Sequence, residues 1–351
     1  MAHQYLIVFA ICILFVFLED YLKKEDKLVT YIALCVMMVL LPATKDVIDT
    51  PDAQNYEDMF YRTSSLGIYT ELMIEPSFLF ISDTLRNAGF SVSALFACYA
   101  IIAIVIKGFF FYKMSPTPIL TMTIYFSTLY ILHDLIQIRV GAAMAFGLGA
   151  LYYYCNDKKI LAAILVGLAT FFHYSAILLG VMFLFNNKPL TTKWRILLFS
   201  IVPLGFFFCV MKLDLLSLIP SFDGGEKIEI YRELSERGQM EEVTLINPIL
   251  WLKTIVFLTA LWYYEFLKDK NKYLPLFIKL MGLSLFLELI LLYTNAIMAF
   301  RLSELFCIVE PFIITSLITL FRPIWVGKAA IVFVSILTAF YSIFVLDYII
   351  T

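Results

Sequence analysis

Residues 158 to 187 read KKILAAILVGLATFFHYSAILLGVMFLFNN, and this stretch decides how the chain crosses a membrane. It holds about 30 residues and would make a helix about 45 Å long, at about 1.5 Å per residue. That is too long for one ordinary span, which needs about 20 apolar residues, and short for two. The stretch therefore predicts either one overlong helix or two short helices that meet near His173.

The composition places the whole chain in a membrane. Of 351 residues, 62% are hydrophobic and 15% are charged, whereas a soluble domain carries about 25% charge. The mean hydropathy is +0.89. Apolar runs recur along the whole length, which excludes a single anchor on a water-soluble enzyme. Besides the quoted stretch, the runs cover residues 3–19, 28–44, 91–112, 117–133, 138–155, 195–211, 248–267, 274–293, 302–320 and 329–347.

The basic residues predict which side each loop faces. If the loop from Glu19 to Lys27 is cytoplasmic, strict alternation places Lys107, Lys113 and Lys158 on the same side, as the positive-inside rule requires. A single helix over the quoted stretch would invert every later loop against that rule, whereas two short helices preserve it. We therefore predict an all-α polytopic integral membrane protein, one transmembrane domain over residues 1–351, with about 12 membrane segments and both termini outside.

Two long segments between the runs fall on the predicted outer face. The first, residues 45–89, contains an amphipathic stretch from Pro76 to Leu85 that fits a helix lying along the membrane interface. The second, residues 212–247, is rich in Glu, and a surface helix is expected there from Glu226 to Arg237.

Several negative signals narrow the chemistry. The first run, from Tyr5 to Leu18, lacks a basic leader and a small-residue cleavage site, so we expect a retained span. The six cysteines stand singly within apolar runs and fit packing residues. The chain contains no Walker loop, dinucleotide glycine fingerprint or HExxH, so we expect no cofactor and no metal. A net charge of −2 gives no electrostatic case for a nucleic-acid partner.

The unusual polar residues of the chain share one predicted side of the membrane. Ionisable groups at membrane boundaries and within spans are costly, so those that persist together mark a site. This asymmetry is the main functional signal of the sequence. The residues are Asp49, Asp52, Tyr56, Glu75, His133, Asp134, Arg139, His173 and Arg301.

Two arginines stand out as candidate anion binders. Arg139 begins an apolar helix whose small residues, starting with Gly141, suit close packing inside a bundle. Arg301 stands among apolar residues, one turn before Glu304. Two guanidinium groups that approach one cavity would clamp phosphate oxygens, because the planar fork matches that geometry. The alternatives are a snorkelling boundary residue for Arg139 and a structural ion pair with Glu304 for Arg301.

The remaining candidates each have a structural alternative. His173 suits a general base or a phosphate donor, or else a histidine satisfied by a carbonyl in the helix break. Asp49 and Asp52, followed by Tyr56, form an acidic turn whose carboxylates could simply be solvated. Glu75 precedes Pro76 and could cap a helix start.

Taken in order, these residues resemble the EpsG-type branch of polysaccharide repeat-unit polymerases, which includes Wzy-like O-antigen and capsule polymerases. The resemblance covers about residues 45 to 310. The matching segments are Asp49 to Tyr56, Glu75-Pro76-Ser77-Phe78, Ile138 to Ala143, Phe172 to Ala176 and Arg301-Leu302-Ser303. Ser77 stands where the pattern has glycine, which bears on the tightness of that turn.

The resemblance implies a GT-C-like helical bundle in the bacterial cytoplasmic (inner) membrane, with a site facing the periplasm. Such a polymerase moves a glycan from undecaprenyl pyrophosphate onto a sugar hydroxyl of the next lipid-linked repeat. Its partners would be donor and acceptor undecaprenyl-pyrophosphate-linked glycans, membrane lipid and a chain-length regulator protein. Arg139, Arg301 and His173 would then bind the pyrophosphate, and Tyr56 would stack on a sugar.

The sequence leaves two questions open. Asp52, Asp49, Glu75 and His173 are all candidates for the base that takes the acceptor proton, with Asp52 ranked first. The same features also fit a flippase or transporter of lipid-linked sugars, or an O-antigen ligase-like transferase. A flippase should line its path with charge through the bilayer, whereas the sequence predicts that the middles of most spans are bare of charge.

Overall fold

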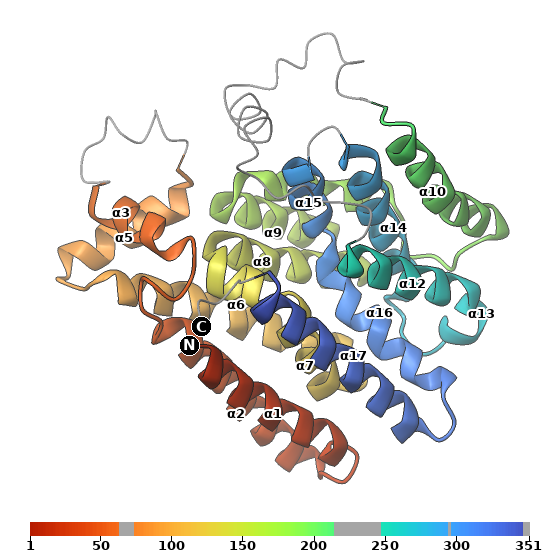
Figure 1. The fold of residues 1–351 in the computed structure, drawn as a ribbon, viewed down its shortest axis with the longest axis horizontal. Helices are drawn as coiled ribbons and strands as arrows, with labels where there is room; N and C mark the ends of the chain where they lie inside the picture. The colour runs from red at the N-terminus through yellow and green to blue at the C-terminus, as the bar shows by residue number, and fades with distance from the viewer. Residues whose placement is uncertain (63–73, 214–246, 294–295, 347–351) are drawn as a thin grey trace. The chain divides into compact units, whose positions relative to one another are not determined.

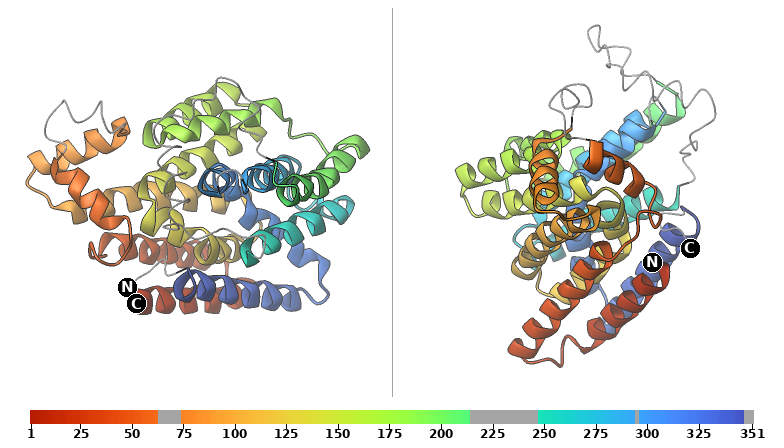
Figure 2. Two further views of the ribbon diagram at one scale, coloured as in Figure 1. Left: turned by 45° about the horizontal axis from the view of Figure 1, so that its top comes forward. Right: turned by 90° about the vertical axis from the view of Figure 1, so that its left-hand side faces the viewer.

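The chain is helical throughout the part that its computed structural model describes, which comprises residues 1–62, 74–213, 247–293 and 296–346. No strand occurs in these ranges, so the predicted all-α class is confirmed. The described residues form two compact units, the first made of residues 1–183 and 314–351 and the second of residues 184–313. Figures 1 and 2 show the helices of both units.

The first unit carries the candidate site residues that precede position 184. Its helices α1 and α17 run side by side (Figure 2), and the Lys328 ammonium of α17 donates hydrogen bonds to the Val16 carbonyl at 3.2 Å and to Asp20 at 2.7 Å. Its elements are α1 (Ala2–Leu18), α2 (Lys24–Ala43), α3 (Ala53–Arg62), α5 (Pro76–Asn87), α6 (Val92–Met114), α7 (Pro118–Thr128), η1 (Ile131–Ile136), α8 (Ile138–Cys155), α9 (Lys159–Phe172), η2 (Tyr174–Leu184), η5 (Ile318–Leu320) and α17 (Ile324–Phe344).

The second unit is a smaller bundle built around α14 (Leu274–Leu291), most of whose side chains are buried. Gly205 and Gly282 allow close packing there, since a Cβ on either would lie within 3 Å of a leucine side chain. The other elements are α10 (Thr192–Val210), α12 (Pro248–Trp262), α13 (Tyr264–Leu267), α15 (Ala296–Glu304), η4 (Cys307–Val309) and α16 (Glu310–Leu317), the last of which ends in the first unit.

The apolar helices fit a membrane-embedded protein. Among the described residues, five helices are long and apolar enough to cross a bilayer, namely α2, α6, α10, α14 and α17. A sixth span arises if the segments Met298–Glu304 and Cys307–Leu320, which are bent by 43°, count as one. Shorter apolar helices are α1, α9, η2 and α12. The count of about 12 membrane segments stays a prediction.

Residues 158 to 187 form two short helices. Helix α9 has 14 residues and η2, a 3₁₀ helix, has 11, so their lengths are about 21 and 22 Å at about 1.5 and 2.0 Å per residue. Between them His173 is extended, with φ −154° and ψ 118°. The rings of Phe146 and Phe172 lie 5.1 Å apart, and those of Tyr154 and Phe183 lie 5.3 Å apart. Helix η2 therefore returns along α8 toward the end from which α9 starts.

The small residues of α8 permit this packing, as the sequence predicts. A Cβ on Gly147 would lie 2.6 Å from Leu179 of η2, and one on Gly149 would lie 2.8 Å from Phe110 of α6. Larger residues at these positions would push η2 and α6 away from α8. Helix α8 thereby holds both of its neighbours at close range.

Two buried ion pairs correct the sequence analysis. We expected Lys107 at the cytoplasmic boundary, but it lies within α6, 1% exposed, and its ammonium is 2.7 Å from the Asp134 carboxylate. In the second unit Lys253 of α12 pairs with Glu288 of α14 at 2.6 Å, both buried. The expectation that the spans are bare of charge is therefore wrong for these helices.

The loops expected on the outer face are described only in part. The stretch from Pro76 begins helix α5, and its placement at the membrane interface stays a prediction. Most of residues 212–247, including the helix expected from Glu226 to Arg237, lies outside the described residues, as do residues 63–73.

The return of η2 along α8 predicts that both ends of this helix pair lie on the same side of the membrane, and the basic residues of the sequence predict that this side is the cytoplasm. In a background lacking the six native cysteines, we expect Lys159→Cys and Lys188→Cys to resist a membrane-impermeant maleimide in intact cells and to react after lysis. Position 188 is suitable because Lys188 is exposed whereas Leu190 is buried. Asp58→Cys, on exposed α3, serves as the external control and should react in intact cells. External labelling of Lys188→Cys would contradict the arrangement.

Candidate functional site

Four elements of the first unit bring candidate residues together. Glu75 is the N-cap residue of α5, Arg139 lies in the first turn of α8, and His173 joins α9 to η2. Tyr56 lies on α3, which is close to α5 in Figure 1. Helix starts and ends converge here because three of these residues, Glu75, Arg139 and His173, stand at breaks. Pro76 starts α5, Gln137 separates η1 from α8, and His173 interrupts the α9–η2 pair.

Glu75 is the centre of this site. One carboxylate oxygen, Oε2, accepts a hydrogen bond from an Arg139 guanidinium nitrogen, and the other, Oε1, lies 2.8 Å from the Nδ1 atom of His173. The carboxylate is therefore shared by a permanent cation and an imidazole. The sequence predicts these three residues as candidates on one side of the membrane, and the structure places them in direct contact.

The three side chains differ in their access to the surroundings. The Glu75 side chain is 5% exposed, whereas those of Arg139 and His173 are 23% and 26% exposed. Glu75 thus lies behind the other two, and only Arg139 and His173 present polar atoms to a molecule that arrives from outside the bundle. Glu75 orients its partners in this arrangement.

Aromatic rings surround the Arg139 guanidinium. Its centre lies 5.4 Å from the ring centroid of Tyr56 and 5.7 Å from that of Phe78, within the range of cation–π attraction. Ser77, which replaces the glycine of the family pattern, is fully buried, and its hydroxyl lies 3.3 Å from the Tyr99 hydroxyl. The serine is therefore accommodated in the first turn of α5 by a hydrogen bond.

The charges at the site shift the pKa values of nearby groups. Burial raises the pKa of Glu75, but the hydrogen bond from His173 and the charge of Arg139 outweigh it and hold this pKa below its ordinary value of 4.5. Burial raises the pKa of Tyr56, opposed by the charge of Arg139. Glu75 is therefore ionised and Tyr56 neutral at neutral pH.

The acidic turn is arranged around a buried lysine that the sequence analysis missed. Lys45 is 2% exposed, donates to the Leu135 carbonyl of η1, and lies 4.2 Å from the ring centroid of Phe96. Burial lowers the pKa of Lys45 to about 7, against the opposing charges of Asp52 and Asp49. In the sequence, a single lysine just after an apolar run is typical of a residue at the membrane boundary. Its burial could therefore be found only from the fold.

The two aspartates have different environments. Asp49 accepts a hydrogen bond from the Asp46 backbone N–H at 2.7 Å, and its carboxylate lies 3.8 Å from the N-terminal ammonium. These contacts are those of a turn residue. Asp52 is half-buried and interacts electrostatically with Lys45 and Tyr56.

The other predicted site residues lie elsewhere. His133 and Asp134 are buried in η1, and Asp134 pairs with Lys107. Arg301 is exposed on α15 of the second unit, and the buried Glu304 ends the same helix. The clamp of Arg139 with Arg301 therefore stays a prediction. In the described ranges no group of three or more His, Cys, Asp or Glu side chains is placed to hold a metal ion.

The arrangement of His173 is that of a base held by a carboxylate. Because Glu75 is an anion, it accepts the hydrogen bond of a protonated Nδ1, and this contact fixes the orientation of the ring and leaves Nε2 unengaged by Glu75. Arg139 stays charged at any physiological pH and supplies fixed positive charge nearby. The site can therefore accept a proton and stabilise an anion at neighbouring points.

The shared carboxylate should also stabilise the fold. Because its pKa is lowered in the folded protein, Glu75 contributes stability that is fully present above pH 4.5 and is lost as the pH falls through the folded-state value. We expect Glu75→Gln to lower the free energy of unfolding by about 1–3 kcal/mol at pH 7, the cost of leaving buried hydrogen-bonding groups unsatisfied. Thermal unfolding in detergent should show a constant difference from pH 6 to 8 that shrinks below about pH 4.5. A difference that persists unchanged at pH 4 would contradict a charged Glu75.

Comparison with known proteins identifies the family of the chain. A family model described as the EpsG family matches residues 28–351, which include all the candidate site residues. No curated protein matches the chain. No solved structure matches it either. Because the match covers most of the chain, the protein belongs to the EpsG family of Wzy-like polymerases.

Proposed function

We propose that this protein polymerises undecaprenyl-pyrophosphate-linked oligosaccharide repeat units into O-antigen, capsular or exopolysaccharide chains at the outer face of the bacterial cytoplasmic membrane. The observation that carries the proposal is the cluster in which Glu75 holds both Arg139 and His173, because it pairs an anion binder with a proton acceptor. Family membership supports a polymerase in general. The substrates are donor and acceptor lipid-linked glycans, with no cofactor or metal required.

Arg139 stabilises the leaving group in this proposal. The bond from the donor's anomeric carbon to the pyrophosphate oxygen breaks, and the electron pair leaves with that oxygen. Fixed cations placed where negative charge develops lower the barrier more than solvent does. Arg139 is partly exposed and anchored through Glu75, so its remaining guanidinium N–H groups meet the pyrophosphate. Arg301 is the proposed second cation.

His173 acts as the general base. An acceptor sugar hydroxyl attacks the anomeric carbon, and its proton passes to Nε2 of His173 as the new glycosidic bond forms. Glu75 keeps Nδ1 protonated and stabilises the imidazolium that results. Attack from the side opposite the pyrophosphate inverts the anomeric centre. Glu75 is a positioning residue in this scheme because both its oxygens are engaged behind Arg139 and His173.

The acidic turn has an indirect role. The negative charge of Asp52 acts on Lys45 and favours its protonated form. Asp52 remains the alternative to His173 as the general base. Asp49 is engaged with the backbone of its own turn and with the N-terminus. Tyr56 is 3% exposed and gives its ring to Arg139, so the proposed stacking on a sugar requires α3 to move.

A flippase or transporter of lipid-linked sugars is the second candidate. The sequence provides little support for a flippase, because most spans lack charge in their middles. The ion pairs Lys107–Asp134 and Lys253–Glu288 add support, because they place charge within apolar helices. Both pairs are buried and mutually neutralised, however, which fits structural links better than the lining of a path. Loss of a polymerase leaves surface glycan of one repeat unit, whereas loss of a flippase leaves none. Loss of a ligase-like transferase would leave full-length polymer that is not attached to its surface anchor, and the same analysis of the glycan would identify it.

Replacement of Arg139 tests the leaving-group role. We expect Arg139→Ala to lower kcat about 100-fold or more, by analogy with removal of one oxyanion donor, and to leave mostly single repeat units on cells. The glycan length distribution and turnover of the cognate lipid-linked unit measure this. Arg195→Ala is the matched control, since Arg195 forms an exposed pair with Glu265 in the second unit. Full-length chains from normally inserted Arg139→Ala protein would refute the role.

Replacement of His173 tests the base. We expect His173→Gln, which retains a hydrogen bond to Glu75, to lower kcat about 100-fold or more. The exposed His3, replaced in the same way, should leave kcat unchanged. If His173→Gln keeps the native kcat, another group accepts the proton, and Asp52→Asn is then the decisive variant.

A further inference from the structure

The segment that leads into Arg139 is an unusual buried helix. Element η1 is a π-helix of six residues, from Ile131 to Ile136, and all six are buried. One residue, Gln137, separates it from α8, whose second residue is Arg139. The π-helix is rare, carries a wider turn than an α-helix and recurs at functional sites. Contacts that hold η1 in position therefore also hold the first turn of α8.

Two buried lysines, Lys107 of α6 and Lys45 in the loop after α2, hold η1. The Lys107 ammonium donates to the Asp134 carboxylate at 2.7 Å and to the Tyr125 hydroxyl at 2.6 Å, and that hydroxyl also donates to Asp134. Lys45 donates to the Leu135 carbonyl. The two lysines thus engage adjacent residues of η1, one at a side chain and one at the backbone.

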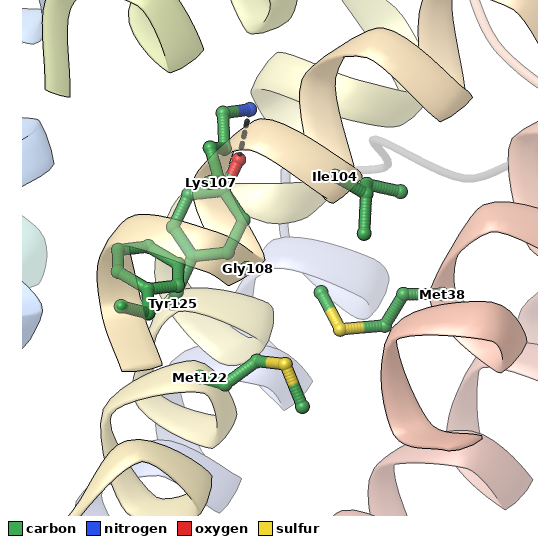
Figure 3. A pocket seen from close by; sticks show the side chains of 7 residues that line it. Met38, Ile104, Lys107, Gly108, Met122 and Tyr125 are labelled. Atoms are coloured by element: carbon green, nitrogen blue, oxygen red, sulfur yellow. Dashed lines mark hydrogen bonds between the residues drawn. The ribbon is translucent and has the colours of Figure 1, made fainter. Parts of the chain in front are cut away.

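The lysine–tyrosine contact lies deep in the first unit. Figure 3 shows Lys107 and Tyr125 pointing toward each other, with Ile104 and the methionines Met38 and Met122 nearby. These residues line a cavity of about 10 Å³, close to the smallest volume that holds one water molecule. The side chains of Lys107 and Asp134 are 1% and 0% exposed, so their charges are matched by each other, and Tyr125 adds hydrogen bonds to both.

The ion pair is in contact with the first turn of α8. A Cβ placed on Gly141, two residues after Arg139, would lie 2.8 Å from the Asp134 carboxylate and 2.3 Å from the His133 carbonyl. Glycine is needed here because any larger residue would collide with the backbone of η1. The charged Asp134 side chain thus packs directly on the turn that carries Arg139.

A buried ion pair is an expensive way to stabilise a fold. Removing two charges from water costs several kcal/mol per ion, and apolar residues of similar volume often stabilise a fold as well or better. In some proteins such a pair serves to specify one arrangement among several. At η1 the ion pair would specify the orientation of the first turn of α8, which bears Arg139.

We infer that Lys107 and Asp134 are positioning residues that fix the π-helix η1 against α8 and thereby hold the Arg139 guanidinium in place beside Glu75 and His173. This inference rests on the proposed function where it concerns turnover. Tyr125 completes the hydrogen bonding of the pair, and Lys45 holds the next residue of η1. A displacement of about 1 Å at a catalytic group can cost about 100-fold in rate, so loss of the pair should act on kcat.

The test uses the full-length protein in nanodiscs and two independent measurements. Hydrogen–deuterium exchange of residues 131–141 reports the placement of η1 without reference to activity. We expect Lys107→Met to increase this exchange and to lower kcat about tenfold or more with a small change in KM, and Lys107→Arg to restore both in part. Lys253→Met is the matched control, since it breaks the equivalent buried pair with Glu288 and should leave exchange at 131–141 unchanged.

A double-variant cycle shows whether Lys107 acts through Arg139. In an Arg139→Lys background, Lys107→Met should cost much less in kcat than in the native background, because the group it positions is already altered. Unchanged exchange at 131–141 in folded Lys107→Met protein, or equal costs in both backgrounds, would overturn the inference. If instead Arg139→Ala alone keeps full kcat while Lys107→Met still loosens η1, the proposed role of Arg139 fails and the positioning of η1 stands.

Discussion

The candidate site depends on one shared carboxylate. Glu75 is almost fully buried, and a buried carboxylate persists only where cations and hydrogen-bond donors compensate for its lost hydration. Arg139 and His173 supply that compensation from two different helices. The start of α5, the start of α8 and the end of α9 must therefore lie at the same level of the first unit. This single requirement explains why three helix ends, rather than three helix middles, meet at the site.

Composition and spacing predict much of this arrangement. The apolar runs predict the helices, and the length of residues 158 to 187 together with the positions of the lysines predicts a helix pair that meets at His173. The pattern Glu75-Pro76, with Arg139 and His173 at later breaks, indicates residues of one site. The sequence could not show that Glu75 binds both of the others, because that depends on how α5, α8 and α9 pack in three dimensions.

The buried lysines were harder to predict. Lys107 is a single charge within the run from 91 to 112, and near a helix end such a residue usually snorkels to the membrane surface. Its partner, Asp134, follows one helix later, and nothing in the spacing of the two residues indicates contact. Lys253 and Glu288 follow the same pattern in the second unit. A lone charge within a predicted span is therefore better interpreted as half of a pair, with the search directed to an opposite charge in a neighbouring run.

The charge of the cluster limits what Arg139 can do alone. Glu75 already neutralises much of the positive charge that Arg139 offers, and His173 is shared with the same carboxylate. The pyrophosphate of the proposed reaction would carry several negative charges, more than Arg139 alone can match. Lys45 cannot supply the difference, because it is buried and bound to η1 and its pKa is about 7. The proposed reaction therefore calls for a further cation from outside this cluster, and Arg301 stays a proposed candidate for it.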